Sequence, residues 1–127
     1  MRMPPEFEQS KHTYVFGSNE LGVHGAGAAK TALTHYGAVY GKGIGFHGQS
    51  YAIPTKDTQI RTLPIEKIKV YVDEFIGFAR AHPDMLFYVT PIGTGLAGYS
   101  HAQMAPLFQD APANCWMIQA WHNVNNP

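Results

Sequence analysis

Two glycine-rich segments constrain the fold of this chain more than any other feature. The first covers residues 17–29 with the sequence GSNELGVHGAGAA, and the second covers residues 91–99 with the sequence PIGTGLAGY. They follow the strand-forming runs 13–16 and 86–90, and a stretch that can form a helix comes after each. A glycine turn between a strand and a helix exposes backbone N–H groups beside a helix N-terminus, which is how α/β proteins hold phosphate. The two segments therefore predict a nucleotide-type ligand clamped from both sides.

Length and charge narrow the classes of protein that need to be considered. A chain of 127 residues has the length of one domain, and we expect a loose leader over residues 1–12 and a single domain over residues 13–127. The formal net charge of +0 argues against a broad nucleic-acid or membrane-binding surface, which would need an excess of basic residues. No apolar run has the length of a signal peptide or a membrane span, so we expect a soluble, cytoplasmic protein.

Cysteine and histidine usage gives little support for metal or thiol chemistry. The single cysteine, Cys115, lies in the apolar run 114–118, and we interpret it as a packed core thiol and not as a nucleophile. The seven histidines form no His-x-x-x-His pair, and no Cys-x-x-Cys motif is present. We therefore expect neither a metal site nor a resident cofactor.

The order of elements predicts an α/β sandwich. The expected strands are residues 13–17, 50–54, 86–90 and 115–119. The expected helices are residues 26–36, a helix beginning at Pro64, and residues 100–108. Residues 41–48 are too rich in glycine to form a regular element. The second helix has one apolar face, formed by Ile65, Ile68, Val72, Phe75, Ile76 and Ala79. Alternating strands and helices indicate a mostly parallel sheet covered on both faces. Ligands bind beyond the carboxyl ends of such strands, where both glycine turns and residues 51–57 should meet.

In this order the segments resemble those of a macro domain, the fold that binds ADP-ribose. The likeness covers about residues 13–119, and it is closest to the branch that contains terminal ADP-ribose protein glycohydrolase and the antitoxin macro domains that remove ADP-ribose from DNA. Three motifs carry it: Gly-Ala-Gly at residues 25–27, Thr-Lys at residues 55–56, and Gly-Thr-Gly-Leu at residues 93–96. The resemblance implies a three-layer α/β/α macro-domain-like fold.

The resemblance also implies roles for individual residues. The two diphosphate loops would comprise Gly25, Ala26, Gly27 and Ala28, and Ile92, Gly93, Thr94, Gly95, Leu96 and Gly98. Asn19 resembles an asparagine that contacts the distal ribose, and Lys56, after Thr55, falls where the glycohydrolase branch has a lysine that attacks the anomeric carbon of that ribose. Ala97 stands where the branch has its catalytic acidic residue, and the early acidic residue that binds adenine is not recognisable here.

Several of these residues have an alternative interpretation from their own chemistry. Asn19 could be a local turn cap, since asparagine at a turn commonly bonds its own backbone. A lysine ammonium is not a nucleophile until burial or a neighbouring cation removes its proton, so Lys56 could instead be a fixed positive partner for phosphate. Asp57 or Glu20 could replace the missing acid, or both could be solvated loop residues.

Further ligand contacts are expected from histidines and aromatic residues near the turns. His24 lies inside the first glycine-rich segment, and His47 lies in another glycine-rich stretch, so either could donate a hydrogen bond to the ligand. Candidates to stack on adenine are Tyr51, Tyr99, Phe46 and Trp121. Among them Tyr99 is favoured, because it directly follows the second loop.

The sequence leaves three functions open. A binding module would hold ADP-ribose or a related NAD-derived nucleotide. A hydrolase would remove ADP-ribose from a protein, a nucleic acid or a small molecule with Lys56 and either Asp57 or Glu20. A third possibility is a protein-interaction module whose cleft has lost its ligand. Ala97 favours the binding module and Lys56 favours the enzyme.

Overall fold

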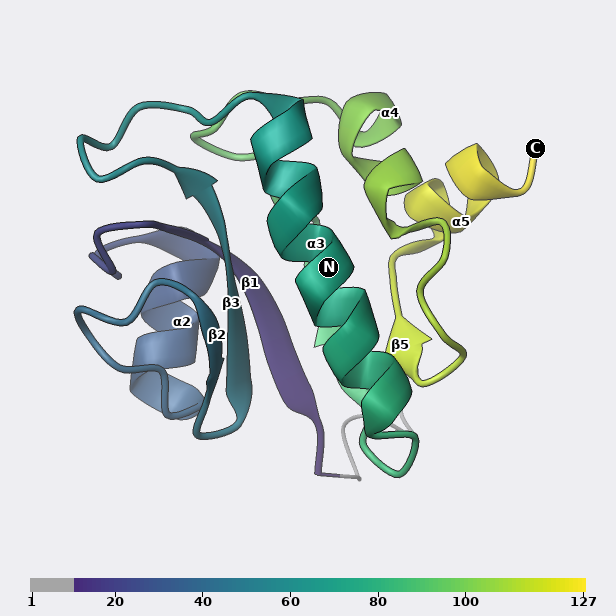
Figure 1. Cartoon of the computed structure of the whole chain (residues 1–127), viewed down its shortest axis with the longest axis horizontal. Helices are drawn as coiled ribbons and strands as arrows, with labels where there is room; N and C mark the ends of the chain where they lie inside the picture. The colour runs from purple at the N-terminus through teal and green to yellow at the C-terminus, as the bar shows by residue number, and fades with distance from the viewer. Residues whose placement is uncertain (1–10) are drawn as a thin grey trace.

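The chain folds around one mostly parallel sheet in the order β2-β3-β1-β4-β5 (Figure 1). This computed structural model describes residues 11–127, so the predicted leader lies outside the described residues except for positions 11 and 12. The strands are β1 (Thr13–Asn19), β2 (Gly45–His47), β3 (Ser50–Lys56), β4 (Phe87–Val89) and β5 (Cys115–Trp116). Strand β1 pairs in parallel with both β3 and β4, and β4 pairs in parallel with β5, whereas β2 is antiparallel to β3. The predicted mixed α/β fold with a mostly parallel sheet is confirmed.

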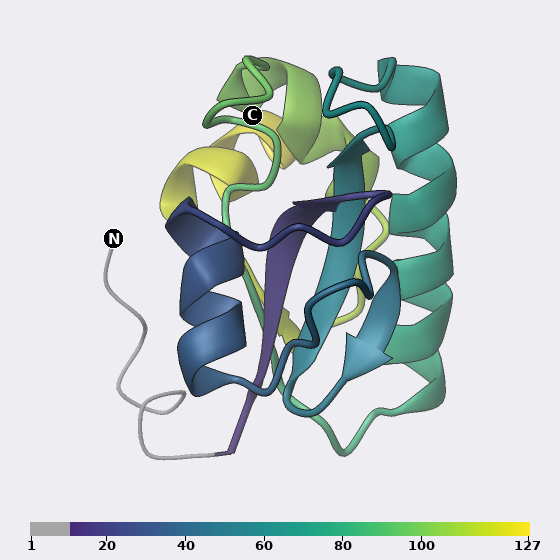
Figure 2. The same cartoon turned by 90° about the vertical axis from the view of Figure 1, so that its left-hand side faces the viewer.

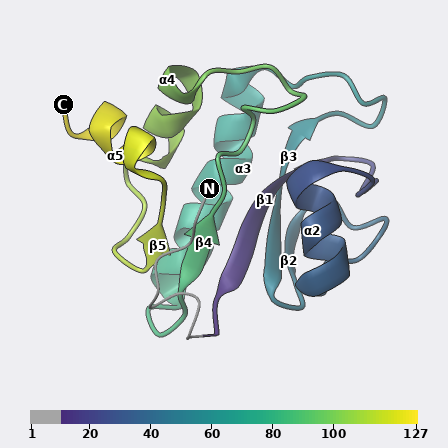
Figure 3. The same cartoon turned by 180° about the vertical axis from the view of Figure 1, so that it is seen from behind.

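Helices cover both faces of the sheet. Figure 2 shows α2 (Gly27–His35) on one side of the strands and α3 (Ile65–Ala81) on the other. The chain also forms α4 (His101–Met104), the 3-10 turn η1 (Ala105–Phe108) and α5 (Gln119–Asn125). These last three elements pack together, and α3 also contacts η1 (Figure 3). Within residues 11–127, no helix has the length and apolar character needed to cross a membrane.

Alternation along the strands divides the core into two clusters. Successive side chains of a strand point to opposite faces, so Val15 packs in the cluster under α3 while Phe16 packs in the cluster under α2. The larger cluster contains Ile53, Phe87 and Val89 together with residues of α3, η1 and α5. The three central strands β3, β1 and β4 are thus largely buried on both faces.

Helix α3 follows its predicted apolar face. Ile68, Val72, Phe75, Ile76 and Ala79 are all buried on the sheet. On the solvent side, Lys69 and Asp73 form an i,i+4 ion pair at 2.9 Å. The helix begins directly after Pro64, whose fixed φ angle suits a helix start.

Several predicted boundaries differ from the structure. The strand expected to end at Pro54 continues as β3 to Lys56, because its parallel partner β1 continues beside it. Three further differences have a local reason. Residues 45–47 form β2 although glycines surround them, because a short antiparallel pairing needs only backbone hydrogen bonds to β3. The predicted helix over residues 100–108 changes to a 3-10 turn at Ala105, since Pro106 has no N–H for the next α-helical bond. The predicted strand over residues 115–119 ends at Trp116, and α5 follows, fixed to the core by the fully buried Trp121.

The predicted core thiol is confirmed. Cys115 is buried, with 7% of its surface exposed. Burial raises the pKa of this thiol to about 12, so it stays protonated at neutral pH.

Replacement of Phe75 by alanine should strongly destabilise the fold. The Phe75 ring is fully buried and lies 5.0 Å from the Tyr51 ring and 5.4 Å from the Phe87 ring, measured between centroids. We expect the free energy of unfolding to fall by about 3–5 kcal/mol in urea denaturation followed by circular dichroism. The control is Gly77→Ala in the same helix, where an added Cβ meets open space, and it should raise stability by about 0.5–1 kcal/mol. A loss below about 1 kcal/mol for Phe75→Ala would contradict the packing described.

Candidate functional site

The connections that leave β1 and β4 run toward opposite edges of the sheet. After β1 the chain passes through α2 and β2 to β3, and after β4 it passes through α4 and η1 to β5. Because β1 and β4 are neighbours, their carboxyl ends flank a switch point in the strand order. Open α/β sheets form a ligand crevice at such a point, since the two following loops diverge there.

A cleft of about 630 Å³ lies at this edge of the sheet. Four segments line it, namely residues 17–19 with Val23, residues 25–29, residues 55–56 with Ile60, and residues 90–97. Gly17 lies between the strand ends, since a Cβ built there would be 3.4 Å from Ile92 and 3.6 Å from Thr55. The three predicted segments therefore converge. Of the residues expected to contact a ligand, the cleft includes Asn19, Gly25, Ala26, Gly27, Ala28, Thr55, Lys56, Ile92, Gly93, Thr94, Gly95 and Leu96.

Both glycine loops carry backbone donors without an acceptor. The N–H groups of residues 25–29 donate no hydrogen bond to any described residue, and the same is true of Gly93, Gly95, Leu96 and Ala97. Ala26 occupies the N-cap of α2 and offers no side-chain acceptor, so the first turn of that helix is uncapped. A helix N-terminus carries roughly half a positive charge. The cleft thus presents a concentration of N–H donors suited to an anion.

Hydrogen bonds fix the shape of the first loop. The Asn19 side-chain oxygen accepts from the N–H groups of Gly22 and Val23 at 2.8 Å and 3.0 Å, and its Nδ2 donates to the Val23 carbonyl at 2.9 Å. These contacts use both lone pairs of that oxygen and leave one N–H for a ligand. The loop is buttressed by residues 41–43, where a Cβ on Gly43 would lie 1.9 Å from the Asn19 carbonyl oxygen. Residues 41–43 therefore pack against the first loop and help to fix its shape.

Among the described residues that line the cleft, Lys56 is the one with an ionisable side chain. Within residues 11–127, the ion pairs are Asp57–Arg61 and Lys69–Asp73, so no described carboxylate is paired with Lys56. The Lys56 backbone carbonyl accepts from the Glu20 N–H at 2.8 Å, which joins the end of β3 to the first loop. The cleft therefore combines one free cation with backbone donors and holds no acidic side chain in its described lining.

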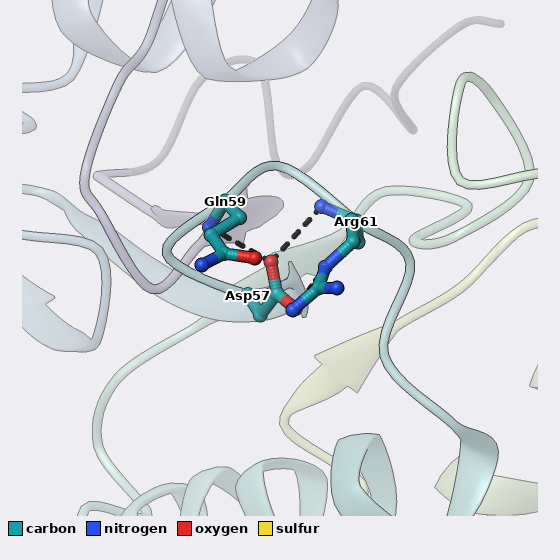
Figure 4. A network of polar contacts seen from close by, with 3 residues as sticks. All are labelled: Asp57, Gln59 and Arg61. Carbon is teal, nitrogen blue, oxygen red and sulfur yellow. Dashed lines mark hydrogen bonds and ion pairs between the residues drawn. The ribbon is translucent and has the colours of Figure 1, made fainter.

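The two acids considered for catalysis point to other partners. The Glu20 carboxylate accepts a hydrogen bond from the Tyr71 hydroxyl on α3. Asp57 accepts from the N–H groups of Gln59 and Arg61 at 2.8 Å and 3.0 Å, and it pairs with the Arg61 side chain at 3.2 Å (Figure 4). Neither residue lines the cleft. Their geometry supports structural roles, in the loop–helix contact and in the turn after β3.

His24 and Tyr99 support the loops from inside the protein. His24 is 1% exposed, and its Nε2 lies 3.2 Å from the Lys42 carbonyl oxygen, while its buried Nδ1 has no partner among the described residues. The Tyr99 hydroxyl donates to the Leu63 carbonyl at 2.5 Å, and Gly98 turns the chain with a φ of 88°. His24, Gly98 and Tyr99 are not among the cleft-lining residues.

The other suggested aromatic and histidine contacts lie away from the cleft. Tyr51 and Trp121 are buried in the larger core cluster. Phe46 packs on Phe78 with ring centroids 5.1 Å apart, and His47 is the last residue of β2, just before the turn that leads to the amino end of β3. Ile60 also lines the cleft, and no motif or spacing in the sequence predicted it. Within the described part of the chain, no group of three or more His, Cys, Asp or Glu side chains could hold a metal ion.

The chain matches no protein-family model, no curated protein and no solved structure. The resemblance to macro domains therefore stays a prediction that rests on the three motifs.

The carboxyl group of Asp57 should take up its proton at a lower pH than an ordinary carboxyl group does. Hydrogen bonds from the Arg61 and Gln59 N–H groups, together with the Arg61 charge, lower the pKa of Asp57 from its ordinary value of 3.8. Because the pKa of Asp57 is lower in the folded protein, its ionised carboxylate stabilises the fold above pH 3.8. This stabilisation is lost as the pH falls through the lower folded-state pKa. We expect the amide shifts of Gln59 and Arg61 to titrate with a midpoint below 3.8 in two-dimensional NMR. In Asp57→Asn that titration should disappear, and a midpoint at or above 3.8 would contradict the contacts in Figure 4.

Proposed function

We propose that this protein is a macro-domain-like module that binds ADP-ribose or a related NAD-derived nucleotide in the cleft. The observation that carries the proposal is the set of backbone N–H groups without acceptors in the loops after β1 and β4. Two donor-rich loops on opposite sides of a switch point suit a diphosphate, which carries oxygen acceptors on both of its phosphorus atoms. The motif resemblance supports the same ligand.

The charge of the cleft agrees with an anionic ligand. Lys56 supplies a positive charge that no described carboxylate neutralises. The N-terminus of α2 adds the positive end of a helix dipole. In this arrangement Lys56 contacts a phosphate as a cation and needs no change in protonation.

Hydrolysis of an ADP-ribosyl bond is the second candidate, and one observation favours it: Lys56 lines the cleft. In that reaction the neutral Lys56 amine would attack the anomeric carbon, the leaving group would take the bonding electrons and a proton, and water would release the ribose. General acid–base catalysis would need a second titratable group, such as a carboxylate, within hydrogen-bond reach. The described lining has none, and Glu20 and Asp57 are engaged elsewhere. Binding without turnover is therefore the function that we favour. A ligand-free protein-interaction module is less favoured still, because it gives the unpaired N–H groups no role.

Methyl groups added at Gly25 and Gly95 should block the ligand without harming the fold. A Cβ at either position meets no atom within 4 Å, and neither residue has a positive φ. We expect Gly25→Ala and Gly95→Ala to weaken ADP-ribose binding about tenfold or more in calorimetric titration, which corresponds to about 1.4 kcal/mol. Thermal unfolding should show both variants as stable as the wild type, and Gly77→Ala should bind like the wild type. Unchanged affinity in both cleft variants would contradict a ligand lying against the loops.

Replacement of Lys56 separates binding from hydrolysis. Lys56→Met keeps the length of the side chain and removes its charge, so ADP-ribose affinity should fall about 10- to 100-fold, the size of a lost hydrogen bond to a charged group. Wild-type protein incubated with ADP-ribosylated protein or nucleic acid should release no ADP-ribose, as followed by mass spectrometry. Release by the wild type that disappears in Lys56→Met would instead establish the hydrolase. Lys69→Met, on the exposed side of α3, is the matched control.

A further inference from the structure

The chain after β3 folds back on itself as a short hairpin, defined here as residues 55–63. The Asp57 N–H donates to the Arg61 carbonyl at 2.8 Å. The Leu63 N–H donates to the Thr55 carbonyl at 2.9 Å, so the two arms of the hairpin pair in an antiparallel manner. The Asp57 carboxylate fixes the turn between the arms (Figure 4). Leu63, at the end of the second arm, is buried in the larger core cluster, which fixes that arm relative to the sheet.

Lys56 and Thr62 lie directly opposite each other in this hairpin. Directly opposed residues of an antiparallel pair have their side chains on the same face, with Cβ atoms about 5 Å apart. The Thr62 side chain therefore stands beside that of Lys56, although Thr62 is not among the described residues that line the cleft. On its other side, the Lys56 backbone pairs with Asn19, and its carbonyl accepts from the Glu20 N–H at 2.8 Å. Lys56 is thus held between the first glycine loop and Thr62.

The second arm of the hairpin also binds the second glycine loop. The Thr62 hydroxyl donates to the Ala97 carbonyl at 3.2 Å. The Tyr99 hydroxyl donates to the Leu63 carbonyl at 2.5 Å. These contacts link the loops that follow β3 and β4, two strands that are separated in the sheet by β1. Sheet pairing connects the two loops through β1, whereas the hydroxyl groups of Thr62 and Tyr99 join them directly.

We propose that Thr62 is a positioning residue for Lys56, which sets the distance between the Lys56 ammonium group and the N–H groups of the second glycine loop. This inference rests on the proposed function and adds that Lys56 and the second loop hold one phosphate group together. Charge-assisted hydrogen bonds are short, about 2.7–2.9 Å, so a lysine that moves away from the loop loses a phosphate bound there. A lysine side chain is flexible, and Thr62 beside it limits the positions that the ammonium group can reach.

A double-substitution cycle, measured by calorimetric titration with ADP-ribose, tests this role. Thr62→Val keeps the β-branched shape and removes the hydroxyl, and we expect it to weaken binding about fivefold, the size of one lost hydrogen bond. In the Lys56→Met protein the same substitution should weaken binding by less than about twofold, because the group that Thr62 positions is gone. A merely structural role would give the fivefold loss in both backgrounds, since independent effects add.

Matched variants separate the hydroxyl from other effects of the substitution. Thr62→Ser keeps the hydroxyl and should bind like the wild type. Thr58→Val makes the same change at an exposed threonine in the turn of the hairpin, outside the described lining of the cleft, and should leave the affinity unchanged. Thr62 is itself exposed, so every variant should unfold at about the wild-type temperature. Should Thr62→Val not fold, Thr62→Ala provides the same comparison with a smaller side chain.

Three outcomes would overturn the positioning role while leaving the proposed function in place. In the first, Thr62→Val binds ADP-ribose like the wild type. In the second, its loss is the same with and without Lys56→Met. In the third, Thr62→Ser loses as much affinity as Thr62→Val. Absence of ADP-ribose binding by the wild type would overturn the proposed function and the positioning role together.

Discussion

The cleft depends on the divergence of the chain at the carboxyl ends of β1 and β4. One connection leads back to β3 and the other continues to β5, so the chain leaves these two neighbouring strand ends in opposite directions. The parallel pairing of β1 with β3 and β4 brings three loops to the same edge of the sheet. A slip of one residue in either pairing would exchange the two faces of β1, on which Val15 and Phe16 pack in different clusters. Burial of both faces therefore fixes the register, and the register fixes the geometry of the cleft.

The chemistry of this edge comes mainly from the backbone. Glycine and alanine leave the N–H groups accessible, while polar side chains near the first loop are used to hold it in shape. Asn19 and Asp57 illustrate this division, since each binds N–H groups of its own turn and so fixes a loop that borders the cleft. Lys56 is then the charged group left for a ligand in the described lining. An anion site of this type requires little net charge, which agrees with a chain whose formal net charge is +0.

The sequence was most informative where a local pattern determines the backbone. The apolar face of α3 and the two glycine turns were predictable from spacing, because helical periodicity and tight turns leave a direct trace in the residues. Side-chain partners were not predictable in this way. Glu20 bonds Tyr71, which is 51 residues later, and His24 lies beside Lys42, so both contacts exist only once the sheet has formed. Ile60 was missed for the same reason: its place in the cleft depends on the Asp57 turn and on the Thr62–Ala97 contact between two loops.

The proposed function depends on one interaction, in which the unpaired N–H groups of the two glycine loops hold the phosphates of a nucleotide. The most direct test is a two-dimensional ¹H–¹⁵N NMR titration of assigned wild-type protein with ADP-ribose. We expect the amides of residues 25–29, Gly93 and residues 95–97 to shift together in a saturable manner, while the amide of Gly77, an exposed residue of α3, does not move. Saturable shifts confined to other parts of the chain, or no shift at millimolar ADP-ribose, would contradict it.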